Sequence, residues 1–255
     1  MPDPLTHSPE FPQNIAESDR SNDRCGGTRA RILVAAGPVF ASRGYDGATV
    51  REICSAASVN IASVGYHFGD KLGLYRSVIQ DLRLARAKRF PAPNTDAEEP
   101  QKTLHELVQT LLARMLTTED AAWETELLLR EMQSPTPVFE SIVEEFFRPL
   151  FEQLVETTRL LVKTDFPEQT LQQLAFSIVG QCLYYRVGAR AIQVLIPEQQ
   201  LQQHYRIDSL SRHITAVMLA AIENASSLQQ YIEHTDCGKT VQKFNQDVSH
   251  PPKVN

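Results

Sequence analysis

Hydrophobic residues recur at spacings of three and four along most of the chain, which is the period of an α-helix. The first such stretch begins at Thr28 and places Ile32 and Phe40 on one face. Gly44 follows in a position that helix C-caps favour, whereas Pro38 interrupts the stretch. The pattern therefore predicts a first helix from Thr28 to about Gly44, with an irregularity at Pro38.

Two short helices are expected next. Thr49 and Glu52 have the spacing of a capping box, in which the threonine hydroxyl accepts from the amide three residues on and the glutamate reaches back. This box predicts the start of a helix over about 50–57. A tight turn over 58–60 then leads into a second short helix over about 61–67.

Helical periodicity continues to residue 227, and no stretch is a convincing strand. Asp70 is expected to cap a longer helix that ends near Phe90, before a linker over 91–100. Pro149 should kink or divide the longest of the later helices. These later helices are expected at about 101–117, 121–133, 136–164, 168–194 and 206–227. The predicted fold class is all-α.

The composition is that of an ordinary soluble protein, with 42% apolar and 22% charged residues. No apolar run approaches the roughly 18 residues that span a bilayer, and the N-terminus lacks the features of a secretory signal. We therefore expect a cytoplasmic protein. The four cysteines are scattered and lack the spacing of a metal site or a disulfide framework, so no metal and no cofactor is expected. Buried or tail thiols are favoured, and a redox sensor is the alternative.

Charge is unevenly distributed along the chain. Residues 28–76 carry six basic and three acidic groups, a net charge of +3, whereas residues 101–227 carry ten and sixteen, a net charge of −6. The total of −6 thus conceals a basic N-terminal part. Because local charge sets the attraction to phosphate, this part is suited to nucleic acid.

The segment 49–68 has the pattern of a helix-turn-helix. Two short helices joined by a three-residue turn allow the first to brace the second, which enters a major groove about 12 Å wide. Lys71 and the Thr49 hydroxyl are placed to reach phosphates. The exposed side of the second helix would carry small or hydrogen-bonding residues, namely Ser63, Gly65, Tyr66 and His67. The segment predicts sequence-specific binding to double-stranded DNA.

Three motifs in this region resemble the N-terminal domain of TetR-family transcriptional regulators, over about residues 26–86. They are phenylalanine-x-x-x-glycine-tyrosine from Phe40, threonine-x-x-x-isoleucine from Thr49, and tyrosine-histidine-phenylalanine from Tyr66, before a lysine. The resemblance implies phosphate contacts from Thr49, Tyr66, His67 and Lys71, and contacts facing the bases from Arg51, Asn60, Ile61, Ala62 and Ser63. For Tyr66 and His67, packing against the following helix is the alternative, and Arg51 is equally suited to clamp a phosphate.

Two positions depart from the family pattern. Ser58 stands in the turn where the family usually has glycine, which implies slight strain. Gly65 stands where the family often has an aromatic residue, and glycine has no side chain with which to contact a base.

The later part of the chain, at 127–154 and 177–191, resembles the C-terminal domain of the CecR (YbiH-like) branch of the same family. The resemblance implies a homodimer with a ligand-binding domain. A dimer is also favoured by symmetry, because two helix-turn-helix units related by a two-fold axis make twice as many base contacts on a palindromic site as one unit does. The interface is expected on the helices over 168–194 and 206–227. The alternative is that the apolar stripes of these helices belong only to the core of the domain.

A ligand pocket is expected between the helices of this second domain, mostly apolar with a few polar groups. Arg130 and Arg148 would suit a ligand carboxylate, or would pair with nearby glutamates. The candidate lining residues are Trp123, Leu127, Arg130, Phe147, Gln181, Tyr184 and Tyr185.

The expected organisation is a disordered tail over 1–27, a DNA-binding domain over 28–90, a helical ligand-binding and dimerisation domain over 101–227, and a polar tail over 228–255. The predicted function is a ligand-responsive repressor that binds a palindromic operator as a homodimer and is released by a small-molecule inducer. No catalytic constellation stands out, so an enzyme is disfavoured. The alternative is a helical protein-interaction module without DNA binding.

Overall fold

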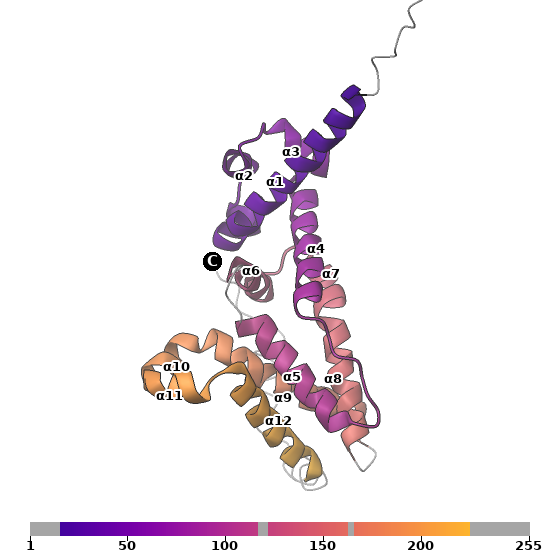
Figure 1. The fold of residues 1–255 in the computed structure, drawn as a ribbon, viewed down its shortest axis with the longest axis vertical. Helices are drawn as coiled ribbons and strands as arrows, with labels where there is room; N and C mark the ends of the chain where they lie inside the picture. Colours follow the sequence, from indigo (N-terminus) through magenta and orange to yellow (C-terminus); the bar gives the residue numbers. More distant parts are fainter. Residues whose placement is uncertain (1–15, 117–121, 163–165, 225–255) are drawn as a thin grey trace, which may run out of the picture. The chain divides into compact units, whose positions relative to one another are not determined.

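The computed structural model describes residues 16–116, 122–162 and 166–224. All regular elements in these ranges are helical, which confirms the all-α fold class (Figure 1). The helices form two compact units, each built from two separate parts of the chain. Unit 1 comprises residues 1–89 and 118–146, and unit 2 comprises residues 90–117 and 147–255.

Unit 1 contains the predicted helix-turn-helix. Its N-terminal helices are α1 (Ala16–Gly47), α2 (Val50–Ala57), α3 (Ala62–Phe68) and α4 (Lys71–Arg89). The later part of the chain adds α6 (Ala122–Gln133), α7 (Phe139–Ile142) and most of the π-helical turn η1 (Val143–Phe147). Thus residues 122–146, which the sequence favours placing in the second domain, pack with the DNA-binding part of the chain.

The first helix begins at Ala16 rather than Thr28, so residues 16–27 are helical where the sequence predicted a disordered tail. Proline is absent between Pro12 and Pro38, and the two glycines within residues 16–27, Gly26 and Gly27, weaken a helix by only about 1 kcal/mol each. The helix continues through Pro38 and bends at Gly44, whose φ of 74° is a conformation that favours glycine. Residues 1–15 and the predicted tail from residue 228 lie outside the described residues.

A single core joins α6 to the N-terminal helices. Ile32 and Phe40 from α1, Tyr75 from α4 and Leu127 from α6 are all buried within it. The Phe40 and Tyr75 rings meet edge to face, with centroids 4.7 Å apart. Unit 1 is therefore a helix-turn-helix whose core is completed by a helix from the later part of the sequence.

Unit 2 is a second helical body. It comprises α5 (Pro100–Leu116), α8 (Arg148–Leu161), α9 (Glu168–Val187), α10 (Ala189–Leu195), α11 (Glu198–His204) and α12 (Ile207–Glu223). Its core lies between α5, α8, α9 and α12. The helix predicted over 136–164 is divided as expected, and Pro149 lies in the first turn of α8, where proline is tolerated. The helix predicted over 168–194 is interrupted at Gly188, and α11 was not predicted.

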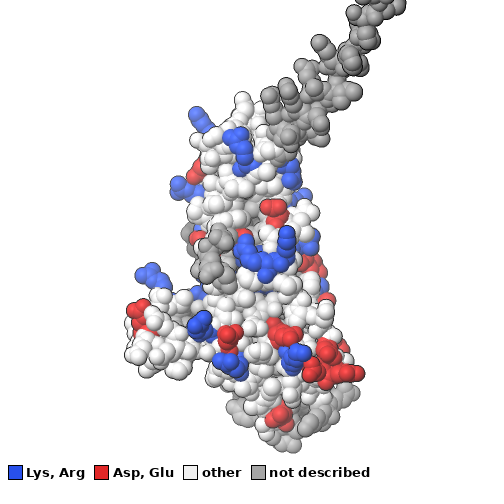
Figure 2. Space-filling model, in the orientation of Figure 1, with Lys and Arg blue, Asp and Glu red and all other residues white. Residues whose placement is uncertain are grey.

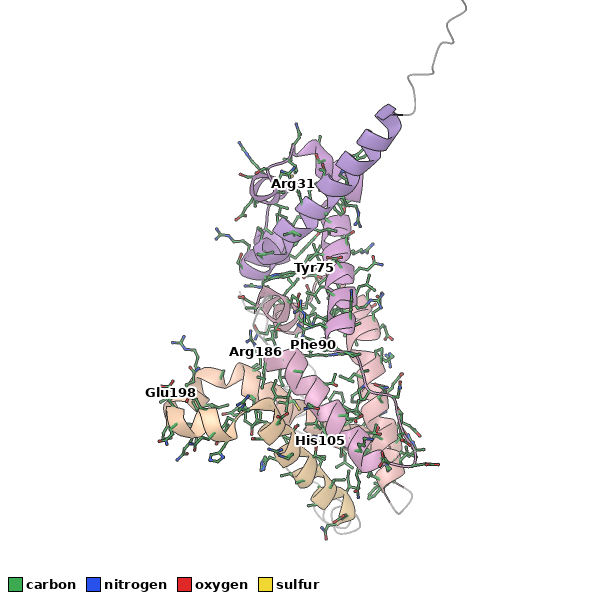
Figure 3. The ribbon with its side chains drawn as sticks, viewed as in Figure 1. Arg31, Tyr75, Phe90, His105, Arg186 and Glu198 are labelled. Atoms are coloured by element: carbon green, nitrogen blue, oxygen red, sulfur yellow. The ribbon has the colours of Figure 1, made fainter. Side chains whose placement is uncertain are left out.

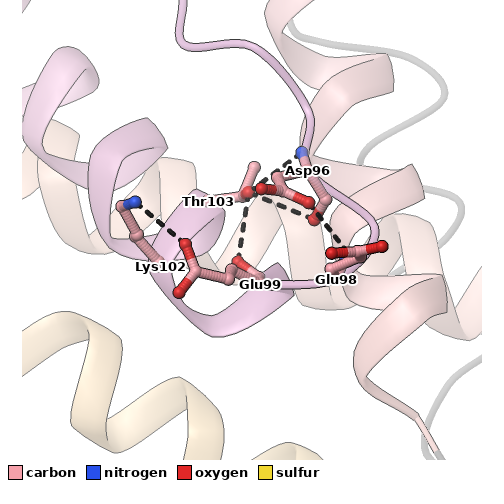
Figure 4. A network of polar contacts seen from close by, with 5 residues as sticks. All are labelled: Asp96, Glu98, Glu99, Lys102 and Thr103. Carbon is pink, nitrogen blue, oxygen red and sulfur yellow. Dashed lines mark hydrogen bonds and ion pairs between the residues drawn. The ribbon is translucent and has the colours of Figure 1, made fainter.

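The linker before α5 is held by local polar contacts (Figure 4). The Thr103 hydroxyl accepts from the Asp96 amide at 3.2 Å and donates to the Glu99 carbonyl at 3.3 Å. Asp96 Oδ1 accepts from the Glu98 amide at 2.8 Å, and Lys102 pairs with Glu99 at 2.9 Å. These contacts fix the start of α5. Among the helices that are described, we find none with the length and apolar content to cross a membrane.

Candidate nucleic-acid interface

The start of α2 is fixed by the predicted cap. The Thr49 hydroxyl accepts from the Glu52 amide at 3.1 Å, as the capping box requires. The Glu52 carboxylate accepts from Arg43 Nε at 3.4 Å instead of reaching back to the cap, so only the threonine half of the predicted capping box is formed. Thr49 and Arg51 are both exposed, so the helix end and one arginine of α2 face solvent. An exposed helix start with a basic residue suits contact with a phosphate.

The turn between α2 and α3 forms a Schellman motif around Ser58. Its amide donates to the Ser55 carbonyl at 3.1 Å, and the Val59 amide donates to the Cys54 carbonyl at 3.0 Å. Ser58 has φ 53° and ψ 48°, the left-handed conformation that the predicted departure from glycine implied. The turn is therefore made without the residue that adopts this conformation at least cost.

Asn60 begins the recognition helix α3. Its side-chain Oδ1 accepts from the Ala62 amide at 2.9 Å, and its carbonyl accepts from the Ser63 amide at 3.0 Å. The side-chain amide nitrogen of Asn60 is a donor that this cap does not use. Ile61 and Ala62 are exposed and Ser63 is half-buried, while Val64 is buried beneath them. The structure thus gathers four of the residues expected to face bases at one end of α3.

The aromatic residues near the end of α3 differ in exposure. Tyr66 is 76% exposed, so it does not pack into the core of unit 1. His67 is half-buried, and its ring lies edge to face against that of Tyr66, with centroids 4.9 Å apart. The Tyr66 hydroxyl is therefore presented to solvent on the same short helix as Ile61 and Ala62.

Lys71 makes contacts that the sequence did not indicate. Its ammonium donates to the Asp46 carbonyl at 3.1 Å and lies 4.7 Å from the centroid of the Tyr45 ring. An ammonium group has three donors, so one hydrogen bond leaves capacity for a phosphate. These contacts hold the amino group over the last turn of α1.

Three structural residues of the interface were not singled out from the sequence. Arg31 from α1 donates to the carbonyls of Ala57 and Ser58, at 2.6 and 2.8 Å (Figure 3). Arg29 lies over the Phe68 ring, 5.3 Å from its centroid. Gly73 lies so close to the end of α3 that a Cβ atom there would be 2.0 Å from the Phe68 carbonyl oxygen. No local pattern marks these residues, because each acts on an element distant in sequence or through the absence of a side chain.

The surface of unit 1 agrees with the charge distribution of the sequence. On the face drawn in Figure 2, basic side chains predominate over unit 1, whereas both signs are mixed over unit 2. Arg31, Arg43 and Lys71 are engaged in the intramolecular contacts described above. Arg51 and Arg76 are exposed. The positive charge thus lies on the unit that carries the helix-turn-helix.

The predicted pocket residues are divided between the two units. Trp123, Leu127 and Arg130 belong to unit 1, where they are used in packing α6. The Trp123 ring lies against Gly37, where a Cβ atom would come within 2.4 Å of it, and Leu127 is fully buried. Arg130 donates to the Ala41 and Ser42 carbonyls at 3.1 and 3.3 Å, so it pairs with backbone rather than with a glutamate.

The other four pocket candidates lie in unit 2. Gln181 is half-buried, and its side-chain nitrogen donates to the Met218 sulfur at 3.3 Å. Tyr185 is half-buried and faces the Tyr205 ring, whereas Tyr184 is 55% exposed and Phe147 lies on the surface. Arg148, the other candidate for a carboxylate, forms an exposed pair with Glu152 at 3.8 Å.

Two of the four cysteines have described side chains, and both are buried. Burial raises the pKa of the Cys54 thiol and raises that of Cys182 to about 12. Both groups are protonated at neutral pH, which disfavours thiolate chemistry. Within the part of the chain that the structure describes, no group of histidine, cysteine or acidic side chains could hold a metal ion.

Comparisons with known proteins agree with this arrangement. A family described as "Bacterial regulatory proteins, tetR family" matches residues 32–78. A second, described as "HTH-type transcriptional dual regulator CecR, C-terminal domain", matches residues 100–222. Similar solved structures include a TetR-like transcriptional regulator from Rhodococcus sp. RHA1, with 19% identity, a TM-score of 0.54, and 76% of this chain and 94% of that chain covered. A HlyIIR mutant protein gives 22% identity, a TM-score of 0.52, and coverage of 78% and 98%.

Curated relatives are regulators of the same kind. The dual regulator CecR of Shigella flexneri is 26% identical over 174 residues, which cover 64% of this chain and 78% of CecR. The repressor BepR of Brucella suis is 33% identical over 102 residues, which cover 38% of this chain and 45% of BepR. The fold and the interface define an all-helical DNA-binding regulator, a class of proteins that are not enzymes. The chain belongs to the TetR family of transcriptional regulators and carries a CecR-type C-terminal domain.

Proposed function

We propose that this regulator is a homodimeric repressor that reads a palindromic operator through α3 and is released by a small-molecule inducer. The observation that carries the proposal is the exposed surface of α3, where Ile61, Ala62 and Tyr66 face solvent above the buried Val64. Exposed Thr49 and Arg51 on α2 supply a phosphate contact and a further contact with phosphate or base. Repression is favoured by analogy, because BepR and other relatives are named repressors.

A dimer is supported by an exposed apolar stripe in unit 2. Phe176, Tyr184 and Val187 follow helical spacing on α9 and are 63%, 55% and 58% exposed, and Val217 on α12 is 43% exposed. Gly180 lies within this stripe, with open space around it that allows close approach of another helix. The deeper apolar residues of these two helices, such as Ile178 and Ile214, are fully buried in unit 2 and belong to its core. We therefore assign the dimer interface to this exposed stripe rather than to the whole apolar surface of both helices.

The interface is tested by changing one residue of the stripe. Val187→Glu places a charge on it and should convert the dimer into a monomer in analytical ultracentrifugation. Val34→Glu is the matched control, because Val34 is 76% exposed on α1, away from this stripe. A wild-type protein that sediments as a monomer at micromolar concentration contradicts the dimer.

DNA reading is tested by selecting duplexes from random sequence with the wild-type protein and measuring affinity at two salt concentrations. Selective binding that weakens steeply with salt is expected. Ser63→Ala should change preference among selected sequences, while Ser141→Ala, at an exposed serine on α7, should have no effect. Failure to enrich any sequence contradicts operator binding and favours a helical interaction module.

The inducer is proposed to bind in the second domain, with Gln181 and Tyr185 as its candidate polar contacts. An inducer acts only by binding the DNA-incompetent state more tightly. Arg130 is assigned a structural role, because its guanidinium is committed to the backbone of α1. A screen of metabolites and drugs against the selected duplex should find a compound that releases it, and Gln181→Ala should shift the concentration required. A compound that releases wild type and variant at the same concentration contradicts the role of Gln181.

A further inference from the structure

Arg31 is an exposed residue of α1, and its guanidinium lies at the C-terminal end of α2, the bracing helix. Its terminal nitrogen donates to two consecutive carbonyls, those of Ala57 and Ser58, at 2.6 and 2.8 Å. The last carbonyls of a helix have no partner within it, and a cation there also interacts favourably with the helix dipole. Arg31 therefore completes the C-terminal cap of α2 from a helix 26 residues away in sequence.

This cap supports an unfavourable turn. The Schellman hydrogen bonds satisfy the Cys54 and Ser55 carbonyls, and Arg31 satisfies those of Ala57 and Ser58. Ser58 holds a left-handed conformation without being glycine, so the turn depends on external contacts more than a glycine turn does. The turn leads directly to Asn60, which caps α3.

A second arginine of α1 acts at the other end of the recognition helix. Arg29 lies 5.3 Å from the centroid of the Phe68 ring, and Phe68 is the last residue of α3. The two arginines are two positions apart on α1, yet one contacts the turn before α3 and the other contacts its final residue. Helix α1 thus contacts both the turn that precedes α3 and the last residue of α3, and these contacts hold α3 in place.

We propose that Arg31 is a positioning residue for sequence readout, which sets the orientation of α3 through the Ala57 and Ser58 carbonyls. This inference rests on the proposed function, in which α3 reads base edges. Direct readout requires side chains to meet base edges with hydrogen-bond geometry, whereas phosphate attraction tolerates a small rotation of the helix. Loss of Arg31 therefore lowers selectivity for the operator more than affinity for DNA in general.

The experiment compares wild type with Arg31→Met, Arg31→Lys and the charge-matched control Arg76→Met. The probes are the duplex that wild type selects from random DNA and a scrambled duplex of equal length. Arg31→Met should bind the selected duplex roughly tenfold more weakly, with scrambled-duplex affinity and its salt dependence nearly unchanged. Arg76→Met should leave the ratio of the two affinities unchanged. Arg31→Lys retains the charge, but its ammonium lies one bond nearer the backbone than the terminal nitrogen of Arg31 that donates to both carbonyls, so it should resemble Arg31→Met in selectivity.

A rescue variant separates positioning from general stability. Ser58→Gly removes the cost of the left-handed turn, so Arg31→Met/Ser58→Gly should recover part of the lost selectivity. All affinities are measured below the melting temperature of each variant. They are calculated with the concentration of active protein, which a stoichiometric titration with the selected duplex gives. If Arg31→Met does not fold, the ratio of the affinities for the two duplexes is measured instead with Arg31→Lys and with Arg31→Met/Ser58→Gly.

Several results overturn the inference. Equal losses on both duplexes, with a shallower salt dependence, make Arg31 a phosphate contact. If both Arg31 variants have the wild-type ratio of affinities for the selected and scrambled duplexes, Arg31 has no role in sequence readout. Absence of selective binding by wild type is a different outcome, because it contradicts the proposed function itself.

Discussion

At the scale of single residues, the position of α3 depends on small steric and conformational details. Ser58 accepts a left-handed conformation, and Gly73 allows the Phe68 carbonyl to approach the start of α4. The strain at Ser58 could be expected from the sequence, since the family pattern has glycine in that turn. The need for glycine at position 73 could not, because it arises from the backbone of a preceding helix.

Gly73→Ala should destabilise unit 1. The added Cβ would stand 2.0 Å from the Phe68 carbonyl oxygen, a backbone atom that moves only if the end of α3 moves. We expect a loss of about 1–3 kcal/mol in the free energy of unfolding, together with weaker binding to the selected duplex. Denaturant unfolding followed by circular dichroism measures the first and fluorescence anisotropy the second. A variant as stable as wild type contradicts the close approach.

Gly65→Ala should have the opposite effect on stability. Gly65 is helical and exposed, and no atom lies within 4 Å of where its Cβ would stand. Replacing glycine by alanine within a helix should stabilise α3 by about 0.5–1 kcal/mol. The same unfolding measurement checks this, and a loss of stability at this position contradicts it.

The buried thiols should be inert in the native protein. Burial raises the pKa values of Cys54 and Cys182, so their thiolates are disfavoured at pH 8, and stability from the protonated thiols is lost only as the pH rises above about 9. In a Cys25→Ser/Cys237→Ser protein, a disulfide reagent at pH 8 should react slowly until denaturant is added. Fast reaction of the native protein contradicts this expectation and supports a redox-sensing role for one of the two cysteines.

At the scale of helices, α6 is joined to α4 by buried polar contacts. Arg86 donates to the Glu124 carboxylate at 3.2 Å, and both side chains are less than 10% exposed. The Tyr75 hydroxyl donates to Glu131, which also accepts from Thr136. Burial and the Glu131 carboxylate raise the pKa of Tyr75 well above its usual range, so its hydroxyl remains a donor. These links fix α6 in register against α4.

Glu124→Gln should strongly destabilise unit 1, because it removes the charged partner of a buried guanidinium. Breaking a buried ion pair from one side costs about 3–5 kcal/mol, whereas an exposed pair contributes about 0–1 kcal/mol. The matched control is Glu156→Gln, whose pair with Arg159 is exposed. Thermal unfolding of the two variants should differ clearly, and equal melting temperatures contradict a structural role for the buried pair.

Most helices could be predicted from periodicity and caps, but their partners could not. The Thr49 box, Asp70 and Pro149 each act within a few residues, so local patterns placed α2, α4 and α8 closely. In contrast, the apolar face of α6 has the same period whether it packs on α1 or on a helix of unit 2. The predicted pocket residues show this ambiguity, because Trp123, Leu127 and Arg130 lie on the face of α6 that packs on α1.

At the scale of the whole molecule, charge and domain organisation must be considered by unit. The total charge of −6 alone would disfavour DNA binding, yet the segment 28–76 is positive. In the same way, the linker over 91–100 suggests a boundary in sequence, whereas residues 118–146 return to unit 1. The smallest folding DNA-binding unit should therefore be discontinuous.

The final prediction concerns this discontinuous unit. A fragment of residues 1–99 lacks α6, so it exposes the α1 surface at Gly37 that Trp123 covers and leaves buried Arg86 without Glu124. We expect this fragment to melt without a cooperative transition, since it loses both apolar burial and a buried ion pair. Residues 1–89 joined by a flexible glycine-serine linker to residues 118–146 should melt cooperatively and bind the selected duplex as a monomer, more weakly than the full chain. Trp123 is the single tryptophan of the chain, so its fluorescence reports directly on the docking of α6 in the linked fragment. Cooperative melting of the 1–99 fragment, with stability equal to that of the linked fragment, contradicts the assignment of α6 to the DNA-binding unit.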